Sequence, residues 1–272
     1  NPEVIADAVA HIPPLQHGDL QALGLCHWTP AGLVQYSFEL VHVFTGLPWF
    51  YTFIAATLLW RAVIFPFAVV GTRASQRLRP YSQRMAAAQA QMQASRLAGD
   101  TVAMQQATLT ATKLRNEAGV SMKQLMAPMI QLPISLGMFI GIRKMCDLPV
   151  LQLTQSGFAW LPDLTQPGPY YILPILVAAS GNLMISMGRR DMDPSRPGVG
   201  HAMNGFRLLT ILTIPWLNTF SSGLLLSLLV TSASAVLQTG ILRVPAVRSA
   251  FGIPPWTPMP GGEMPTVMDT YR

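Results

Sequence analysis

The stretch PWFYTFIAATLLWRAVIFPFAVV, residues 48–70, is apolar almost throughout and contains one charged residue, Arg61. An α-helix rising about 1.5 Å per residue would carry this stretch across a hydrocarbon layer of about 30 Å, with Arg61 about 13 Å from its far end. A guanidinium at that depth costs about 3 kcal/mol on insertion scales, and it cannot lose its proton. Arg61 therefore needs water or polar partners inside the membrane, unless its side chain snorkels to the nearer interface.

The composition is that of a protein with several membrane spans. Half of the 272 residues are hydrophobic and 11% are charged, whereas about 25% are charged in a soluble domain. The expected fold class is an all-α membrane protein with five transmembrane helices, at residues 48–70, 125–142, 170–187, 206–220 and 223–242. The fourth of these, at about fifteen residues, is shorter than the ~20 usually needed to span a bilayer.

A polar and basic segment, residues 73–123, separates the first two predicted spans. Apolar or small residues recur there at alternating steps of three and four, on either side of a break at Gly99 and Asp100. Such a pattern predicts an antiparallel helical hairpin, with Asp100 capping its second arm. Many of these recurring residues are alanines, so the seam, the line of contact between the two helices, buries little apolar area and should be weak. The alternative is two separate surface helices.

The two ends of the chain differ from the 48–242 core. In residues 1–47, a short amphipathic helix at 31–44 is predicted to lie on a membrane surface with its apolar side formed by Leu33, Phe38, Val41 and Phe44. Gln35, Glu39 and His42 lie off that stripe, and residues 1–29 are expected to be irregular. Residues 243–272 are rich in proline and should form an extended tail.

Charge predicts the orientation of the chain. With five spans, the hairpin, the loop at 188–207 and the tail share one side and hold fifteen of the eighteen Lys and Arg residues. By the positive-inside rule, the hairpin and the C-terminus face the compartment where proteins are made. Cys26 and Cys146 then lie on the opposite side, where a disulfide between them is conceivable but is not indicated by their spacing.

Polar residues within the predicted spans form the candidate site. They would line a wet groove if they converge, and they are Arg61, Gln131, Ser135, Asn182, Asn218 and Gln238. The alternative is that they join helices to one another, which we favour for the serines, including Ser180, Ser232 and Ser234, but not for Gln131. No second charge inside the membrane is available to pair with Arg61, since Arg207 lies at the edge of the fourth span, and this disfavours a proton relay or an ion-coupled carrier. No metal-binding, nucleotide-binding or catalytic motif is present, so we expect no cofactor and no enzyme activity.

A set of short motifs, each weak alone, occurs in order from Trp28 to Pro255. They are TPxGLxQxxxExxHVxxGLPW at 29–49, RxxIFP at 61–66, PxxQxPI at 128–134, IRxM at 142–145, DLT at 163–165, YILP at 171–174 and LRVPAVR at 242–248. With a basic hairpin after the first span, this order resembles the Oxa/YidC/Alb family of membrane protein insertases, and most closely its mitochondrial Oxa branch.

The resemblance implies a multi-pass protein of the mitochondrial inner membrane, with its N-terminus in the intermembrane space and its C-terminus in the matrix. It implies an insertase that receives nascent membrane proteins from the large subunit of the mitochondrial ribosome and supports respiratory-chain assembly. The functional positive charge of the family falls on Arg61, in a groove closed toward the far side. No small-molecule substrate is implied. A small-solute or ion transporter and a purely structural assembly factor are the alternatives.

Basic residues of the hairpin are candidate contacts for ribosomal RNA or for inner-membrane lipids: Arg73, Arg77, Arg79, Arg84, Arg96, Lys113, Arg115 and Lys123. Those near the membrane, Arg73, Arg77 and Lys123, should contact lipid, whereas Arg96 near the tip should contact the ribosome. The alternative is that these basic residues form a solvated surface without a specific partner. The family's mitochondrial members carry a long basic tail, but residues 249–272 contain only Arg272, so docking relies on other surfaces or on sequence outside this stretch.

Overall fold

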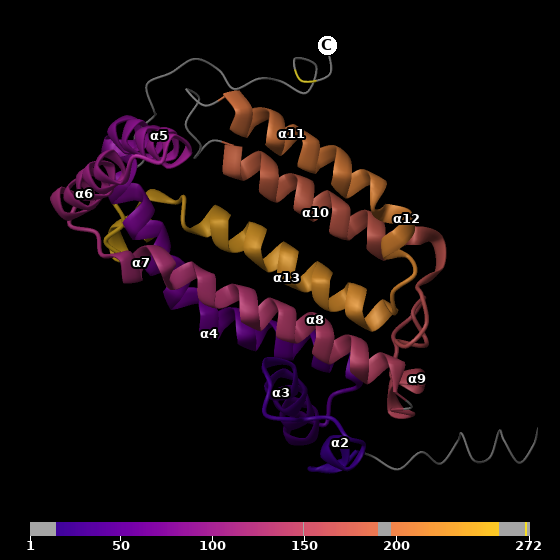
Figure 1. The fold of residues 1–272 in the computed structure, drawn as a ribbon. Helices are drawn as coiled ribbons and strands as arrows, with labels where there is room; N and C mark the ends of the chain where they lie inside the picture. The colour runs from indigo at the N-terminus through magenta and orange to yellow at the C-terminus, as the bar shows by residue number, and fades with distance from the viewer. Residues whose placement is uncertain (1–14, 149, 190–196, 256–269, 271–272) are drawn as a thin grey trace, which may run out of the picture. The chain divides into compact units, whose positions relative to one another are not determined.

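A computed structural model describes residues 15–148, 150–189, 197–255 and 270 (Figure 1). Within these residues the regular structure is helical, apart from one isolated bridge between Phe158 and Leu161. Four helical stretches of the described chain are long and apolar enough to cross a membrane. The all-α membrane fold class is therefore confirmed, while the count of five spans remains a prediction.

The first predicted span is the beginning of a longer helix, α4 (Trp49–Leu78). The apolar run stops at Val70, but α4 continues to Leu78, and Pro80 lies in the 3-10 turn η1 (Arg79–Tyr81) that follows it. The end of the apolar run therefore does not coincide with the end of the helix. Pro66 lies inside α4, where it lacks the amide hydrogen for one intrahelical bond.

The second and third predicted spans each begin with a short turn that leads into a long helix. Residues 125–142 correspond to α7 (Met122–Met126), η2 (Ala127–Ile130) and α8 (Gln131–Asp147). Residues 170–187 correspond to η3 (Pro169–Tyr171) and α10 (Ile172–Arg189).

The last two predicted spans differ in how closely the helices match them. Residues 206–220 are divided between α11 (Pro197–Leu212) and α12 (Ile214–Leu217), because Pro215 has no amide hydrogen to continue the first helix. Helix α11 begins nine residues before the expected start of this span at 206, and the bounds of the span stay a prediction. Residues 223–242 match α13 (Ser222–Ile241) closely.

Short helices occupy segments that were expected to be irregular or extended. They are α2 (Asp19–Ala22), α9 (Gln152–Gln155) and α14 (Pro245–Ala250). The prediction of an extended tail was wrong for α14, where Pro245 occupies the first turn, a position at which its missing amide hydrogen is harmless. Most of the remaining tail lies outside the described residues.

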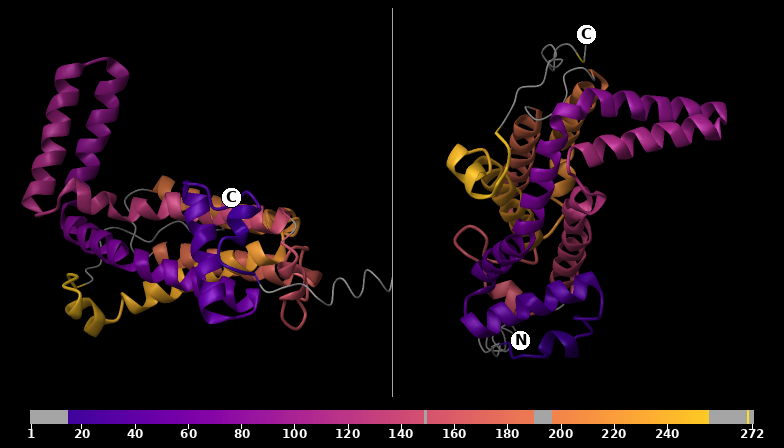
Figure 2. Two further views of the ribbon diagram at one scale, coloured as in Figure 1. Left: turned by 90° about the horizontal axis from the view of Figure 1, so that it is seen from below. Right: turned by 90° about the vertical axis from the view of Figure 1, so that its left-hand side faces the viewer.

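The polar segment between the first two predicted spans forms an antiparallel pair of helices, α5 (Ser82–Ala98) and α6 (Thr101–Glu117), shown side by side in Figure 2. Asp100 caps α6 as predicted, since its carboxylate accepts hydrogen bonds of 3.0 Å from the amides of Val102 and Ala103. The buried seam contains Ala88, Ser95, Ala107 and Leu114. Three of these four buried side chains are small.

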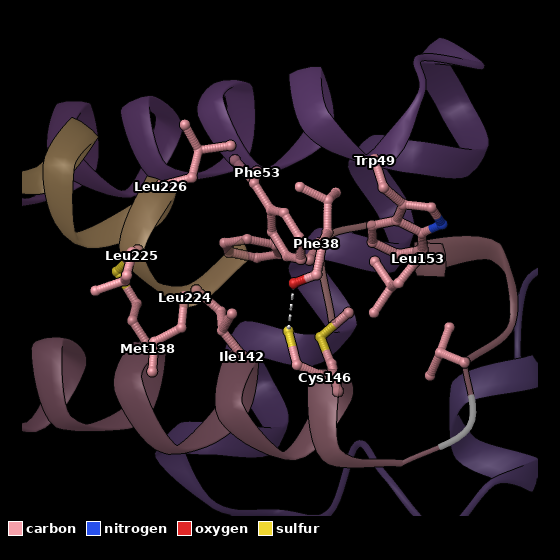
Figure 3. Close-up of a cluster of buried hydrophobic side chains, with 14 of the residues drawn as sticks. Phe38, Trp49, Phe53, Met138, Ile142, Cys146, Leu153, Leu224, Leu225 and Leu226 are labelled. Atoms are coloured by element: carbon pink, nitrogen blue, oxygen red, sulfur yellow. Dashed lines mark hydrogen bonds between the residues drawn. The ribbon is translucent and has the colours of Figure 1, made fainter. Parts of the chain in front are cut away.

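The chain divides into two compact units that share several helices. The first comprises Asn1–Val63, Gln131–Gly188 and Gly205–Leu237. Its core contains Phe38, Trp49 and Phe53, which pack with side chains of α8, α9 and α13 (Figure 3). Helix α3 (Pro30–Thr45) lies against α8, where a Cβ atom on Gly137 or Gly141 would come within 3 Å of the α3 backbone.

The orientation of α3 corrects one expectation. Gln35 and Glu39, expected off the apolar side that faces the membrane surface, are almost fully buried, and of that apolar side Phe38 is buried whereas Leu33 and Phe44 are exposed. The Gln35 side chain accepts a hydrogen bond from the Cys26 amide and donates one to the Gly141 carbonyl, both at 3.0 Å. These partners satisfy the Gln35 side chain, so it can lie inward on α3 while Leu33 and Phe44 lie outside.

The second unit comprises Ile64–Ile130, Arg189–Asn204 and Gln238–Arg272. Its small apolar core joins the second half of α4 to the segment around α14, through Val69, Leu242 and Ile253, with Phe65 and Val247 packed against them. The Arg248 side chain, buried within α14, donates hydrogen bonds to the Pro254 carbonyl and to Gln76 of α4.

Candidate functional site

Arg61 lies on the buried face of α4. The buried positions Phe53, Ala56 and Thr57 precede it at helical spacing, while Leu59 and Val63 are exposed on other sides of the helix. The Arg61 side chain is 8% exposed. The charge predicted from the sequence to lie within the membrane is thus held inside the first unit and does not extend along the lipid-facing side.

Two hydroxyl groups that the sequence analysis missed are buried in the same unit. Thr57 lies one turn before Arg61 on α4, and Ser227 lies on α13. Neither hydroxyl oxygen has a hydrogen-bond partner among the described residues, although both side chains are almost fully buried. A buried hydroxyl without a partner costs about 1–3 kcal/mol, so both positions favour the entry of water or of a polar group from another molecule.

Asn218, a predicted groove residue, shows the same property. Its side-chain oxygen is buried and has no hydrogen-bond partner within the described chain. It follows the short helix α12 as the C-cap residue. The first unit thus contains at least three buried polar groups able to accept a new partner.

Two other polar side chains of the predicted spans join helices to one another. The Ser180 and Ser232 hydroxyls are 2.6 Å apart and connect α10 to α13, as expected for the serines. The Asn182 amide donates to the Thr210 hydroxyl at 2.6 Å and connects α10 to α11. A groove role for Asn182 therefore requires it to exchange this partner for a substrate group.

The remaining predicted groove residues are partly exposed. Gln131 begins α8, and Ser135 lies one turn further along the same helix. Both belong to the first unit together with Arg61, Asn182 and Asn218, whereas Gln238 belongs to the second unit. The groove that these six residues would form remains a prediction.

Polar groups also converge where α3 meets α4. The His42 ring stacks on Trp49 with 4.3 Å between centroids, and its Nδ1–H donates to the Leu47 carbonyl at 2.8 Å. Burial lowers the pKa of His42 below 6.5, and the Leu47 hydrogen bond opposes this effect only in part. The sequence analysis placed His42 on α3 but did not foresee this contact, because Trp49 follows a turn at residues 46–48.

The two cysteines are free thiols. Cys146 is buried and donates a weak hydrogen bond to the Leu164 carbonyl at 3.8 Å (Figure 3). Cys26 is half-buried, and burial together with the charge of Glu39 raises its pKa to about 11. Neither cysteine forms the conceivable disulfide, and no cluster of metal-ligating residues occurs in the described part of the chain.

The basic residues of the hairpin fall into two groups. Arg84 lies 3.7 Å from Glu117 across the two arms, and Arg79 is buried at the base. Arg77, Arg96, Lys113 and Lys123 are exposed. Leu97 and Val102, on either side of the tip, are also exposed, so the end of the hairpin presents apolar as well as basic side chains.

The chain also matches the sequence model of a known protein family. Residues 40–247 match the family described as "60Kd inner membrane protein". The chain belongs to this family. The 60Kd inner membrane protein family is that of Oxa1 and YidC, so the resemblance inferred from the motifs is confirmed.

Individual members of the 60Kd inner membrane protein family align with most of the chain. The mitochondrial inner membrane protein OXA1L of Mus musculus is 31% identical over 233 residues, covering 85% of this chain and 54% of that protein. The mitochondrial inner membrane protein OXA1 of Saccharomyces cerevisiae is 33% identical over 265 residues, covering 94% of this chain and 64% of that protein. The chain thus spans about half to two thirds of the length of these relatives.

Proposed function

We propose that this chain is a membrane protein insertase of the mitochondrial inner membrane. It receives the polar flank of a nascent membrane segment in a groove around Arg61, and the apolar part of the segment then passes sideways into lipid. Its N-terminus lies in the intermembrane space and its C-terminus in the matrix, and its activity supports respiratory-chain assembly. Membership of a family whose relatives are named mitochondrial inner membrane proteins supports this location.

The observation that carries the proposal is the burial of Arg61 within an apolar membrane helix. A charge in this position costs free energy, so we expect it to have polar partners and a functional role. A fixed positive charge attracts acidic residues in the polar flank of a substrate. The flank then crosses less hydrocarbon, which lowers the barrier to insertion without an energy source or a cofactor.

The proposed groove also includes buried polar groups of the first unit, the unit that contains Arg61. Thr57, Ser227 and Asn218 each hold a buried polar atom that lacks a partner among the described residues. Such atoms can bind water or the backbone of an entering chain. We include Gln131, Ser135, Asn182 and Gln238 in the groove on the basis of their place in the predicted spans.

The basic hairpin is the proposed ribosome-binding element. Its arms carry exposed cations beyond the membrane boundary, and ribosomal RNA is a dense polyanion. We propose that the hairpin contacts the large subunit of the mitochondrial ribosome, so that the nascent chain leaves the ribosome close to the groove. The ribosome, the nascent chain and membrane lipids are therefore the proposed partners.

Cysteine crosslinking tests the groove. A nascent membrane protein with one cysteine in its polar flank is arrested on ribosomes and oxidised with a T57C variant whose native cysteines are replaced by alanine. The matched control is L59C, because Leu59 lies on the same helix but is exposed toward lipid. We expect at least tenfold more crosslinked product with T57C. Equal crosslinking at both positions would contradict a groove on the Arg61 side of α4.

A further inference from the structure

A small cavity lies in the second unit, just beyond the end of the apolar run of α4. Its volume is about 40 Å³, and it is lined by Val70, Arg73, Ala74 and Arg77 of α4 and by Gln124 of α7. One water molecule needs about 10–15 Å³ of such space. The cavity can therefore accept about three oxygen atoms between the side chains of two arginines and a glutamine.

The two arginines of this cavity form no ion pair with a carboxylate in the part of the chain that the structure describes. Arg73 and Arg77 are one helical turn apart, where like charges repel each other. The described part of the second unit contains eleven Lys and Arg residues but only two acidic residues. Of these two, Asp100 caps α6 and Glu117 lies beside Arg84. Both carboxylates of the described part of the second unit are thus engaged elsewhere, and this cationic site can take a counter-ion from another molecule.

Arg73 is held in place by the segment that follows α14. Its Nη2 donates to the Phe251 carbonyl, and the Phe251 ring packs against Phe65 with 5.6 Å between centroids. The Nε atom of Arg73 is buried and makes no hydrogen bond to any group in the described residues. The guanidinium is therefore oriented before any ligand arrives, and it has an N–H group that needs an acceptor.

The depth of the cavity identifies the source of the anion. Val70 is the last residue of the apolar run, and its side chain and that of Phe67 are both partly exposed on α4. The apolar surface of the helix thus leads directly to the two arginines. We propose that this cavity binds the phosphate of an anionic phospholipid, with an acyl chain lying along Phe67 and Val70. A phosphate of RNA, which carries no apolar chain, would not use that surface.

Native mass spectrometry of the full chain, purified in detergent and mixed with phospholipid, measures this binding directly. The wild type should retain one phosphatidylglycerol in at least tenfold preference to phosphatidylcholine. R73Q/R77Q should lose this preference. The control R84Q/R96Q removes the same charge from the arms of the hairpin and should keep it. Because Arg77 is exposed, R77Q alone should still fold and should weaken the preference severalfold.

Three results would overturn the proposal. Equal loss in R84Q/R96Q would indicate a diffuse basic surface, and displacement of the lipid by 10 mM inorganic phosphate would indicate a site for a free anion. Unchanged lipid retention in R73Q/R77Q, together with weaker binding of a short RNA, would indicate a nucleic-acid contact. None of these measurements depends on insertion activity, so the lipid site and the proposed function can fail separately.

Discussion

The guanidinium of Arg61 keeps its charge in any surroundings that a protein offers. Its replacement therefore removes a fixed positive charge from the interior of the first unit, and it makes α4 more apolar. Replacing buried charged groups by apolar side chains of similar volume is often neutral or stabilising for a fold, so R61M is the variant that best preserves stability. A loss of function without a loss of stability would thus separate the electrostatic role of Arg61 from a structural one.

Substitution of Arg61 by alanine should impair insertion of substrates with acidic translocated flanks more than of substrates with neutral flanks. The reason is that only acidic flanks gain from the attraction to a positive charge. We expect a difference of about tenfold between the two classes, which corresponds to about 1.4 kcal/mol. Insertion of matched substrates into inner-membrane vesicles, scored by protease protection, measures the effect.

The lysine variant provides the control for this prediction. R61K retains the charge but not the planar fork of donors, so it should restore insertion in part. If R61A reduced insertion of both substrate classes equally, or if lysine restored nothing, the attraction between Arg61 and acidic flanks would not be the basis of its role.

His42 gives the first unit a dependence on pH. Its pKa is lowered by burial, so the unfolded chain binds a proton more readily than the folded protein does. Stability should therefore decrease as the pH falls below about 6.5, the unperturbed value, and should not depend on His42 above pH 7. Thermal unfolding between pH 5 and pH 8 would show this, and H42Q should flatten the acidic part of the curve. An unchanged curve in H42Q would assign the dependence to other groups.

At the scale of elements, the sequence predicted features that depend on neighbouring residues better than features that depend on residues far apart in the chain. The break at Gly99, the Asp100 cap and the stripe of small residues all act within a few residues of one another, so the hairpin could be read from the sequence. The inward position of Gln35 could not, because its partners are the Cys26 amide and the Gly141 carbonyl, and the latter lies more than a hundred residues away. The buried hydroxyl of Thr57 was overlooked, although its spacing of four from Arg61 was a usable signal.

The hairpin tip offers a test of ribosome binding. R96E should weaken co-sedimentation with ribosomes severalfold, most clearly at low salt, because it reverses a charge directed at RNA phosphates. Binding to liposomes of anionic lipid should stay unchanged, since Arg96 lies near the end of α5, far along the chain from the membrane boundary at Val70. R77E is the matched control and should show the reverse pattern. Unchanged co-sedimentation of R96E would exclude the tip as a ribosome contact.

At the scale of the whole molecule, the distribution of Lys and Arg predicts which side each loop faces. The native cysteines are poor reporters of this topology. Cys146 is buried, and the pKa of Cys26 is raised to about 11, so little reactive thiolate forms at neutral pH. Exposed positions serve better, and Trp28 and Leu97 are 97% and 91% exposed.

Labelling of W28C and L97C, each in a background without native cysteines, should report opposite sides. An impermeant maleimide added to mitochondria with a ruptured outer membrane should label W28C, and it should label L97C only after the inner membrane is dissolved. Labelling of L97C in intact inner membranes would place the hairpin in the intermembrane space and overturn the proposed orientation.

The seam of α5 and α6 has a consequence for how this protein can change over generations. Three of the four buried residues of the seam, Ala88, Ser95 and Ala107, have small side chains, and Leu114 is the fourth. Adding seven residues to each arm would repeat the same contacts and lengthen the hairpin by about 10 Å. Such an insertion leaves the membrane helices untouched. The distance that the hairpin reaches from the bilayer is therefore a trait that natural variation, or an engineer, can adjust in steps.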